Sequence, residues 1–519
     1  MQKRLLFLLA LLMTFMSSAM AQVTTSSLSG TVVADGEEVI GATVDVVHKP
    51  SGTHYRAVTN DKGVYTINGM RVGGPYEVTV RCIGFAEQKT GGINLQLGET
   101  FNLKTTLSET AKEMQEVMVS AKGSKFSYER TGASTNISNE QMIAMPTVSR
   151  NVTDFTRLSP YGGNGMTFQG SDGRTANFTV DGANFNNNFG LSSTLPGGGN
   201  PISMEAIEEL QVVISPFDVR QTGFIGGALN AITKSGTNTF KGQAYVYHQN
   251  ENMRGDAVDR EFISGSRDKD RTTTYGFSLA GPIIKNKLFF FVNGELIKSP
   301  GTGTPWRASE NGVGNADAYQ SYTTIADMER VQEHVARKYG YNTGSFTSFP
   351  ADADNKKLLA KITWNINDKN RLDVRYNYTT NSSWVMPNAS SMDGGTRSAF
   401  SRTSLYSMPF ANSMYSLEKN VHSVSVDLNT RLSNSLSNQF LATFSKIDDV
   451  RGSNSAEFPF IDIQDGTNTN TQYMSLGYEL FSYNNAVHNN IFNLKDELIY
   501  TTGRHKITGG GSYEYQMAD

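Results

Sequence analysis

The histidine, serine, lysine and acidic residues of this sequence form no common catalytic or metal-binding motif. The sequence contains no Gly-x-x-x-x-Gly-Lys-Ser/Thr phosphate loop, no His-Glu-x-x-His and no Gly-x-Ser-x-Gly. The seven histidines are scattered and lack the spacing of zinc ligands. Asp61 and Asp181, which stand in Asn-Asp-Lys-Gly and Asp-Gly sequences, are typical turn formers. The sequence therefore predicts neither an enzyme nor a bound metal or cofactor.

The sequence does suggest ligand binding. Long polar segments in the second half of the chain contain aromatic residues that could contact a ligand. Aromatic rings stack on sugars and peptides, and neighbouring amides supply hydrogen bonds. Each of these residues taken singly also fits an ordinary exposed loop. The ligand-binding candidates are Trp306, Tyr319, Tyr322, Trp384 and Tyr406.

The elements that must position these loops are strands with one apolar and one polar face. In 271–279, Thr273, Tyr275, Phe277 and Leu279 alternate with polar or small residues, and 371–378 repeats the pattern. Segments 288–296, 423–429 and 440–444 do the same. The polar face carries Arg, Asp and Glu, which favours a large solvated or plugged interior.

The connections distinguish a membrane barrel from a soluble sheet. Short turns at 285–287, 367–369 and 502–504 alternate with long segments at about 250–269, 299–354, 380–419 and 449–483. Outer-membrane barrels have this pairing of short periplasmic turns with long extracellular loops. The sequence predicts a transmembrane β-barrel from residue 237 to residue 519.

The first residues predict export. Lys3 and Arg4 precede an apolar core from Leu5 to Phe15, and Ala19-Met20-Ala21 is a small-x-small cleavage site, so 1–21 is predicted to be a signal peptide. A membrane anchor is the alternative, although the core is short of the roughly 20 residues that span a bilayer. The single cysteine, Cys82, excludes an intrachain disulfide. A net charge of −3 without a basic run argues against nucleic-acid binding.

Two smaller domains are predicted between the signal peptide and the barrel. β-rich runs at 28–33, 42–48, 63–67, 76–82 and 101–107 predict a small antiparallel sandwich over 25–108. A mixed α+β domain follows over 123–236. In it, Ser138 caps a short helix that stops at Pro146, 150–158 is a second helix, and Ser203 caps a helix from Met204 to Leu210 ahead of a strand to Ile214.

Ordered motifs then identify family resemblances. Ser29-Gly30-Thr31-Val32, Ile40 to Val44, Thr59 to Tyr65 and Ile83-Gly84-Phe85 resemble the carboxypeptidase regulatory-like domain. Residues Asn177 to Gly182, Ile207 to Val212 and Gly226 to Gly236 are similar to the plug of TonB-dependent receptors. Thr237 to Gly242 and Gly281 to Phe291 resemble the Oar-like subgroup of those receptors.

The resemblance implies an outer-membrane receptor for energy-coupled uptake of an oligosaccharide, peptide or metal chelate. The inner-membrane partner would be TonB, which pulls a short periplasmic segment that offers a free strand edge. Glu116, Val117, Met118, Val119, Ser120 and Ala121 are the candidate segment, in the linker 109–122. The alternative is that these residues form the first strand of the plug.

Several questions stay open at this point. The alternative function is adhesion, with the barrel as an anchor in the outer-membrane lipid. A surface lipoprotein is a further partner that the sequence leaves open. The family's barrels have about 22 strands, whereas about nine are recognisable here, and an unclosed barrel would expose a sheet edge to lipid. We therefore expect the sequence to be a C-terminally truncated part of a longer protein.

Overall fold

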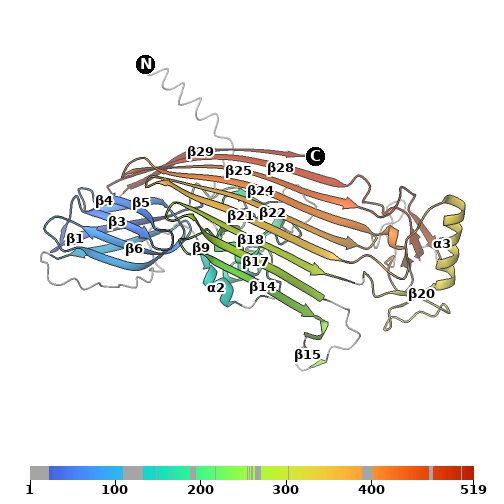
Figure 1. Ribbon diagram of the computed structural model, residues 1–519. Coiled ribbons are helices and arrows are strands. Elements are labelled where there is room, and N and C mark those ends of the chain that lie inside the picture. The colour runs from blue at the N-terminus through green and yellow to red at the C-terminus, as the bar shows by residue number, and fades with distance from the viewer. Residues whose placement is uncertain are drawn as a thin grey trace, which may run out of the picture.

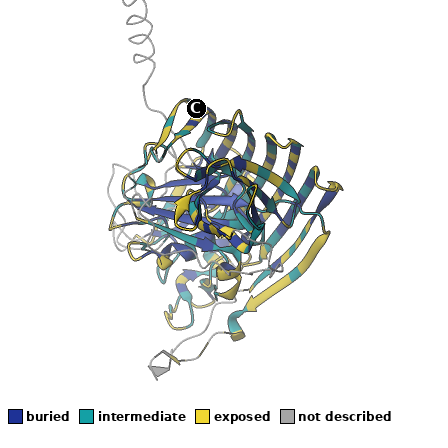
Figure 2. Ribbon diagram, turned by 90° about the vertical axis from the view of Figure 1, so that its left-hand side faces the viewer, coloured by how far each residue is buried: buried dark blue, intermediate teal, exposed yellow. Residues whose placement is uncertain are grey.

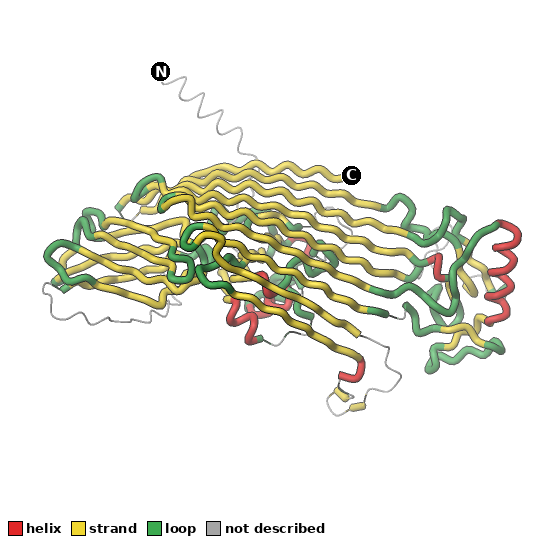
Figure 3. The backbone as a smooth tube through the Cα atoms, viewed as in Figure 1, coloured by secondary structure: helices red, strands yellow, loops and turns green. Residues whose placement is uncertain are grey.

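The structure is a computed structural model of a mainly β chain with three successive parts (Figure 1). It describes residues 23–108 and 133–519, apart from 146, 148, 164, 187–194, 215, 217, 254, 256, 259–260, 263–270, 302, 388–400, 467–471 and 504. The predicted signal peptide and the candidate TonB-contacting segment lie outside the described residues. A small sandwich lies at one end, a plug domain lies along one face of a broad sheet, and loops gather at the other end (Figures 1 and 3).

The sandwich, residues 23–108, packs two four-stranded sheets face to face. One sheet contains β2 (Glu37–Glu38), β1 (Ser26–Ala34), β5 (Val64–Met70) and β8 (Thr100–Leu107). The other contains β4 (Thr53–Val58), β3 (Thr43–His48), β6 (Gly73–Arg81) and β7 (Gln88–Leu95). Alternate residues of each strand are buried, for example Val44 and Val46 of β3, so the inner faces form one apolar core.

The predicted strands of the sandwich are confirmed, but one pair of strands runs in a different relative direction from the prediction. All five predicted runs are strands, and β2, β4 and β7 are additional. The prediction of a purely antiparallel sandwich is wrong, because β1 and β8 pair in parallel from Ser27↔Thr100 to Ala34↔Leu107. The chain crosses to the other sheet through β6 and β7 before it returns as β8, and such a crossover permits parallel pairing.

The plug, residues 133–236, is built on a five-stranded sheet. Its order is β11 (Ala183–Asn184), β10 (Asn177–Val180), β13 (Ala228–Thr233), β12 (Ile207–Ile214) and β9 (Ala133–Ser138). Short helices fill the connections: α2 (Asn139–Ala144), η1 (Val152–Leu158), η2 (Gly173–Thr175) and η3 (Met204–Ala206). Residues of β10, β12 and β13 are nearly all buried, so this sheet is the centre of the plug core.

Two of the predicted plug helices need correction. Ser138 caps α2 and forms a capping box with Gln141, as predicted. The 150–158 segment is a 3₁₀ helix that starts at Val152, with Asn151 as its cap. The helix from Met204 to Leu210 is wrong: only Met204–Ala206 is helical, and Ile207 already pairs with Thr233 of β13. Strand pairing overrides the local helix signal here, and the Ser203 hydroxyl makes no cap hydrogen bond.

Nine long strands form one continuous antiparallel sheet, called here the barrel sheet. Their order follows the sequence: β14 (Lys241–Asn250), β17 (Arg271–Ile284), β18 (Leu288–Ser299), β21 (Ala353–Asn367), β22 (Asn370–Val385), β24 (Tyr415–Arg431), β25 (Leu436–Gly452), β28 (Ala486–Thr502) and β29 (His505–Ala518). The described sheet is open, with β14 and β29 as its edges. Tight turns join the strands at the sandwich end, and long segments join them at the other (Figure 3).

Burial in the barrel sheet is reversed relative to a soluble protein. The concave face buries polar and charged residues such as Glu295, Lys357 and Arg375, whereas Phe277, Phe444 and Phe492 of the convex face are each more than a third exposed. Buried and exposed residues therefore alternate along the strands in Figure 2. An exposed apolar face opposite a polar interior is the pattern of a transmembrane barrel wall.

The long connections are folded, and together they form what we call the loop assembly, from the described parts of 299–353, 386–414 and 453–485. Its core contains Met328, Met408, Phe410 and Met474. Its elements are β19 (Arg307–Ser309), β20 (Gln320–Thr324), α3 (Ile325–Tyr339), β23 (Met408–Pro409), η6 (Ala411–Ser413), β26 (Ile461–Gln464) and β27 (Gln472–Leu476). The connection after β14 holds η4 (Glu251–Met253), β15 (Ala257–Val258) and β16 (Glu261–Phe262). Among the described helices, none is long and apolar enough to cross a membrane.

Candidate functional site

A buried ion cluster around Asp181 joins the plug to the barrel sheet. Asp181 and Gly182 form the predicted turn after β10, both with positive φ (44° and 76°). The Asp181 carboxylate accepts hydrogen bonds from the backbone N–H and the hydroxyl of Thr233 in β13. Its Oδ2 atom lies 3.5 Å from Lys361 Nζ of β21 and 3.4 Å from Arg375 Nε of β22. One carboxylate thus connects two plug strands to two barrel strands.

Glycine is favoured at residue 182 because the backbone there has a φ of 76°, which other residues rarely adopt. A Cβ atom at residue 182 would lie 2.6 Å from Leu441 Cδ2 of β25, closer than real Cβ atoms approach. The Asp-Gly turn therefore brings the plug backbone directly against the barrel wall, and Ser425 of β24 donates a hydrogen bond of 3.0 Å to the Asp181 carbonyl oxygen.

A second buried cluster joins the plug to β18 and β21. Glu295 and Lys357 form an ion pair of 2.8 Å, and both side chains are almost completely buried. The hydroxyl of Ser203, in the plug, and that of Tyr245, in β14, donate to Glu295 Oε2 at 3.1 Å and 2.9 Å. The Ser203 side chain thus bonds to the barrel, which explains why it is not available as a helix cap.

Further polar contacts extend the plug interface along the sheet. Arg220 of the plug bonds Asp218 and reaches Glu497 of β28 at 3.3 Å. Thr379 of β22 donates to the Pro201 carbonyl oxygen at 2.7 Å. Hydrogen bonds and ion pairs with a polar wall, together with few apolar contacts such as Phe291 and Val421, hold the plug in place. Such contacts can be exchanged for hydrogen bonds to water one by one.

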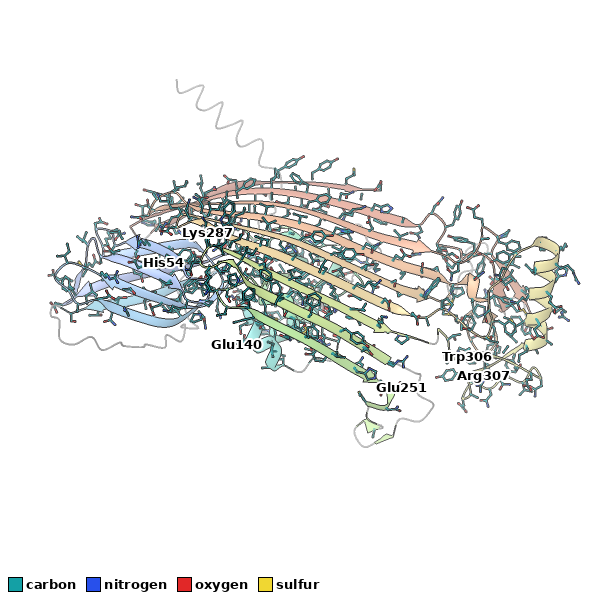
Figure 4. All side chains as sticks on the ribbon, in the orientation of Figure 1. His54, Glu140, Glu251, Lys287, Trp306 and Arg307 are labelled. Atoms are coloured by element: carbon teal, nitrogen blue, oxygen red, sulfur yellow. The ribbon has the colours of Figure 1, made fainter. Side chains whose placement is uncertain are left out.

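The ligand-binding candidates lie in or beside the loop assembly and form two pairs. The Trp306 and Tyr319 rings meet edge to face at 5.5 Å, and the Tyr322 and Tyr406 rings lie 5.6 Å apart. Trp384, the fifth candidate, is near the end of β22 and lines a hollow of about 240 Å³ with Pro305, the neighbour of Trp306, and Met414. Figure 4 places Trp306 and Arg307 at the end of the molecule opposite His54 of the sandwich and Lys287 of a barrel turn.

A third aromatic group in the loop assembly was missed by the sequence analysis. A hollow of about 440 Å³ is walled by Phe458, Phe460, Tyr478 and Tyr483, and the ring of Phe458 stacks on Tyr341 at 4.0 Å. The signal was present, since Phe458-Pro459-Phe460 and the 478–483 run are the densest aromatic segments of that connection. Their proximity arises from the fold, because β26 and β27 pair between them.

The loop assembly is held by a buried ion pair of its own. Arg402 is completely buried, and its guanidinium donates two hydrogen bonds to Asp462 of β26 at 2.9 Å and 2.6 Å. Gln472 and Ser475 of β27 donate to the same carboxylate at 3.1 Å and 2.7 Å. The pair links two connections that are 60 residues apart in sequence. In the part of the chain that the structure describes, no group of His, Cys, Asp or Glu side chains could hold a metal ion.

Comparisons with known proteins agree with this architecture. The Outer membrane beta barrel domain family matches residues 232–519, and the Carboxypeptidase regulatory-like domain family matches residues 27–108. The TonB-dependent transporter Oar of Myxococcus xanthus is 24% identical over 387 residues, which cover 70% of this chain and 34% of Oar. The chain thus spans about a third of that relative.

One solved structure supports the fold. The outer membrane transporter YddB from Escherichia coli superposes with a TM-score of 0.50 at 14% identity, over 74% of this chain and 48% of YddB. The siderophore receptor PirA from Pseudomonas aeruginosa has a TM-score of 0.44 at 14% identity, over 75% of this chain and 49% of PirA. The barrel match covers more than half of the sequence and coincides with the strands whose apolar face is exposed. The chain therefore belongs to the outer membrane β-barrel domain family, and it lies in the outer membrane.

Proposed function

We propose that this chain is the receptor part of a TonB-dependent transporter, which captures a ligand at the loop assembly and delivers it to the periplasm. The main support for this proposal is the position of the plug. It lies on the polar face of the barrel sheet and is joined to it by the Asp181 and Glu295 clusters. A barrel that served only as an anchor would not need an interior domain held by exchangeable polar contacts.

The proposed pulling segment is Glu116 to Ala121, between the sandwich and the first described plug strand. Beyond this segment the chain enters β9, which forms the edge of the plug sheet and pairs with β12. An edge strand can be removed without breaking the pairing between the remaining strands. A pull on residues 116–121 would therefore act first on an edge strand of the plug.

The proposed ligand is a glycan, a peptide or a metal chelate that presents flat or ring-shaped surfaces. The Trp306–Tyr319 and Tyr322–Tyr406 pairs supply aromatic faces in a polar setting, which suits stacking combined with hydrogen bonds. Tyr322 is 42% exposed, so part of its ring is free for contact. These residues remain candidates, and the Phe458 hollow joins them.

Copurification with TonB tests the energy coupling without knowledge of the ligand. We expect the full-length protein in detergent to retain the purified periplasmic domain of TonB, and we expect deletion of residues 116–121 to abolish retention. β-augmentation needs this segment's backbone, so a variant that scrambles the order of the same six residues should keep part of the binding. Undiminished retention by the deletion variant would exclude this segment, and absence of retention by the unaltered protein would favour the adhesion alternative.

A further inference from the structure

The sandwich is bonded to the barrel turns and to the plug. Figure 2, which looks from the sandwich end, shows it in front of the arc of barrel strands. Several hydrogen bonds join it to the turns and strand ends of the barrel. They include Thr24 with Asp427 at 2.7 Å, Thr53 with Asn365 at 2.9 Å, Tyr55 with Arg371 at 3.1 Å and Asn60 with the Gly503 carbonyl at 3.4 Å.

Leu97 is the point at which the sandwich is joined to the plug. Its N–H donates to Glu209 Oε1 at 2.8 Å, and its carbonyl oxygen accepts from Gln211 Nε2 at 2.7 Å and Asn136 Nδ2 at 3.0 Å. Asn136 also donates to Glu209 Oε1 at 2.8 Å. We call these four residues the latch. The Leu97 side chain is fully buried in a small apolar cluster with Val23, Val72 and Ile232.

A charged chamber lies between the three parts of the chain, beside the apolar cluster that holds Leu97. The chamber has a volume of about 430 Å³. The sandwich contributes Arg71 and Val72 to its wall, the plug contributes Glu208 and Lys234, and the barrel sheet contributes strand residues that include both cations of the Asp181 cluster. A ligand that passed the Asp181 cluster would enter this chamber, and the sandwich forms its wall on the side of the barrel turns.

The latch depends on β9, the edge strand of the plug. Asn136 lies in the middle of β9, opposite Gln211 of β12, and within the described residues β12 is the strand to which β9 is paired. Displacement of β9 would remove Asn136 from both Leu97 and Glu209 at once. The strand that follows the linker thus holds two interfaces, one with β12 and one with the sandwich.

We propose that the sandwich is a periplasmic exit gate, latched to the plug at Leu97, and that removal of β9 from the plug sheet weakens the latch by taking away Asn136 and leaving only Glu209 and Gln211 of β12. The proposal rests on the proposed uptake function for the force that removes β9, whereas the docking itself does not require a ligand or TonB. A pull on the linker would then both loosen the plug and open the chamber that receives the ligand.

The latch should respond to pH through Glu209. Burial raises the pKa of the Glu209 carboxyl to about 8, with the like charges of Glu99 and Glu208 adding to the shift, while the Leu97 N–H and Asn136 oppose it. Undocking would expose the Glu209 carboxyl to water and so lower its pKa, which means that docking would bind a proton at pH values between the ordinary carboxyl pKa and about 8. Docking should therefore weaken as pH rises from 5 to 8, by up to about tenfold per pH unit, and stay constant above that range.

Glu209→Gln is the matched variant for this pH response. It keeps an oxygen that can accept from Leu97 and Asn136 but cannot titrate. We expect this variant to hold the sandwich closed at all pH values. The ratio of its labelling rate to that of the unaltered protein at each pH then isolates the contribution of Glu209. Equal pH dependence in the two proteins would show that Glu209 does not control docking.

Thiol labelling measures the opening of the gate. Val72 is 5% exposed and lies in the apolar cluster beside Leu97, so a Val72→Cys reporter, with Cys82 replaced by serine, is shielded when the sandwich is docked. The full-length protein in detergent is treated with a membrane-impermeant maleimide. Asn136→Ala removes one of the two side chains that donate to the Leu97 carbonyl oxygen. The adjacent Thr135→Ala, whose side chain makes no hydrogen bond that the described residues show, is its control. We expect Asn136→Ala to label about 10- to 100-fold faster than Thr135→Ala.

A second pair of variants tests the role of β9. Successive N–H groups of a strand point to opposite sides, so one of the N–H groups of Ser134 and Thr135 points toward β12. The double variant Ser134→Pro with Thr135→Pro therefore removes a hydrogen bond to β12, because proline has no N–H. It leaves the latch side chains unaltered. We expect this variant to label as fast as Asn136→Ala, whereas Ser134→Ala with Thr135→Ala stays slow. Rapid labelling of the reporter in the unaltered background, or slow labelling of the Asn136 and proline variants, would overturn the proposal. Failure of TonB coupling would leave these labelling results unchanged, so the two proposals are separable.

Discussion

Replacement of Asp181 by asparagine should loosen the plug by about 3–5 kcal/mol, because the change leaves two buried cations without their shared carboxylate. Lys361 and Arg375 are less than a tenth exposed, and Asp181 Oδ2 lies within 3.5 Å of both charged groups. Asparagine can still accept the Thr233 N–H, so the turn after β10 should keep its shape. The loss of plug stability in Asp181→Asn would therefore result from the missing negative charge and not from a change in the local fold.

Hydrogen exchange of the plug strands measures this loss. Exchange of backbone amides in β10 and β13 should accelerate by about 100- to 1,000-fold in Asp181→Asn, since each 1.4 kcal/mol changes an opening equilibrium tenfold. Asp172→Asn is the matched control, because Asp172 is exposed and its side chain accepts the N–H of Arg174 as the cap of η2, a role that asparagine fills equally well. Exchange that is unchanged in Asp181→Asn would mean that solvent, and not Asp181, balances the two cations.

Replacement of Asp462 by alanine should unfold the loop assembly. The carboxylate accepts two hydrogen bonds from the buried Arg402 guanidinium and one each from Gln472 and Ser475. Removal of one partner of a buried ion pair costs about 3–5 kcal/mol. Because this pair joins two connections, its loss should separate them while the barrel strands stay intact.

Limited proteolysis separates this effect from a general loss of stability. Cleavage within 453–485 should be about 100- to 1,000-fold faster in Asp462→Ala, because cleavage of a transiently open segment follows its open population. The exposed Asp317→Asn of the same assembly should behave as the unaltered protein. Arg402→Leu combined with Asp462→Leu should be less sensitive than Asp462→Ala alone, since no buried charge is left. Equal cleavage in all variants would show that the apolar core around Met328 holds the assembly by itself.

The sequence was sufficient to predict the parts of the fold that depend on local patterns. Alternation in 271–279 and 371–378, with short turns between long connections, predicts the barrel strands because an exposed apolar face must match the lipid. Ser138 and Gln141 predict a helix start because both partners of the capping box lie within four residues.

Features that depend on distant residues could not be predicted in this way. Met204–Leu210 has a helix signal, yet pairing with β13 makes most of it a strand. The parallel pairing of β1 and β8 depends on how the two sheets pack. The Arg402–Asp462 pair and the Asp181 cluster join residues 60 to 194 positions apart, and no local spacing marks them. The latch at Leu97 depends on a backbone group, which sequence patterns do not reveal.

Growth competition between the native gene and two deletion variants tests the proposed energy-coupled uptake. The native gene is compared, across defined sole carbon, nitrogen and iron sources, with a complete deletion and with a deletion of residues 116–121 that still reaches the outer membrane. We predict that both deletions lose growth on the same source. Normal growth of the 116–121 deletion on a source that the complete deletion cannot use would show that uptake does not depend on this segment.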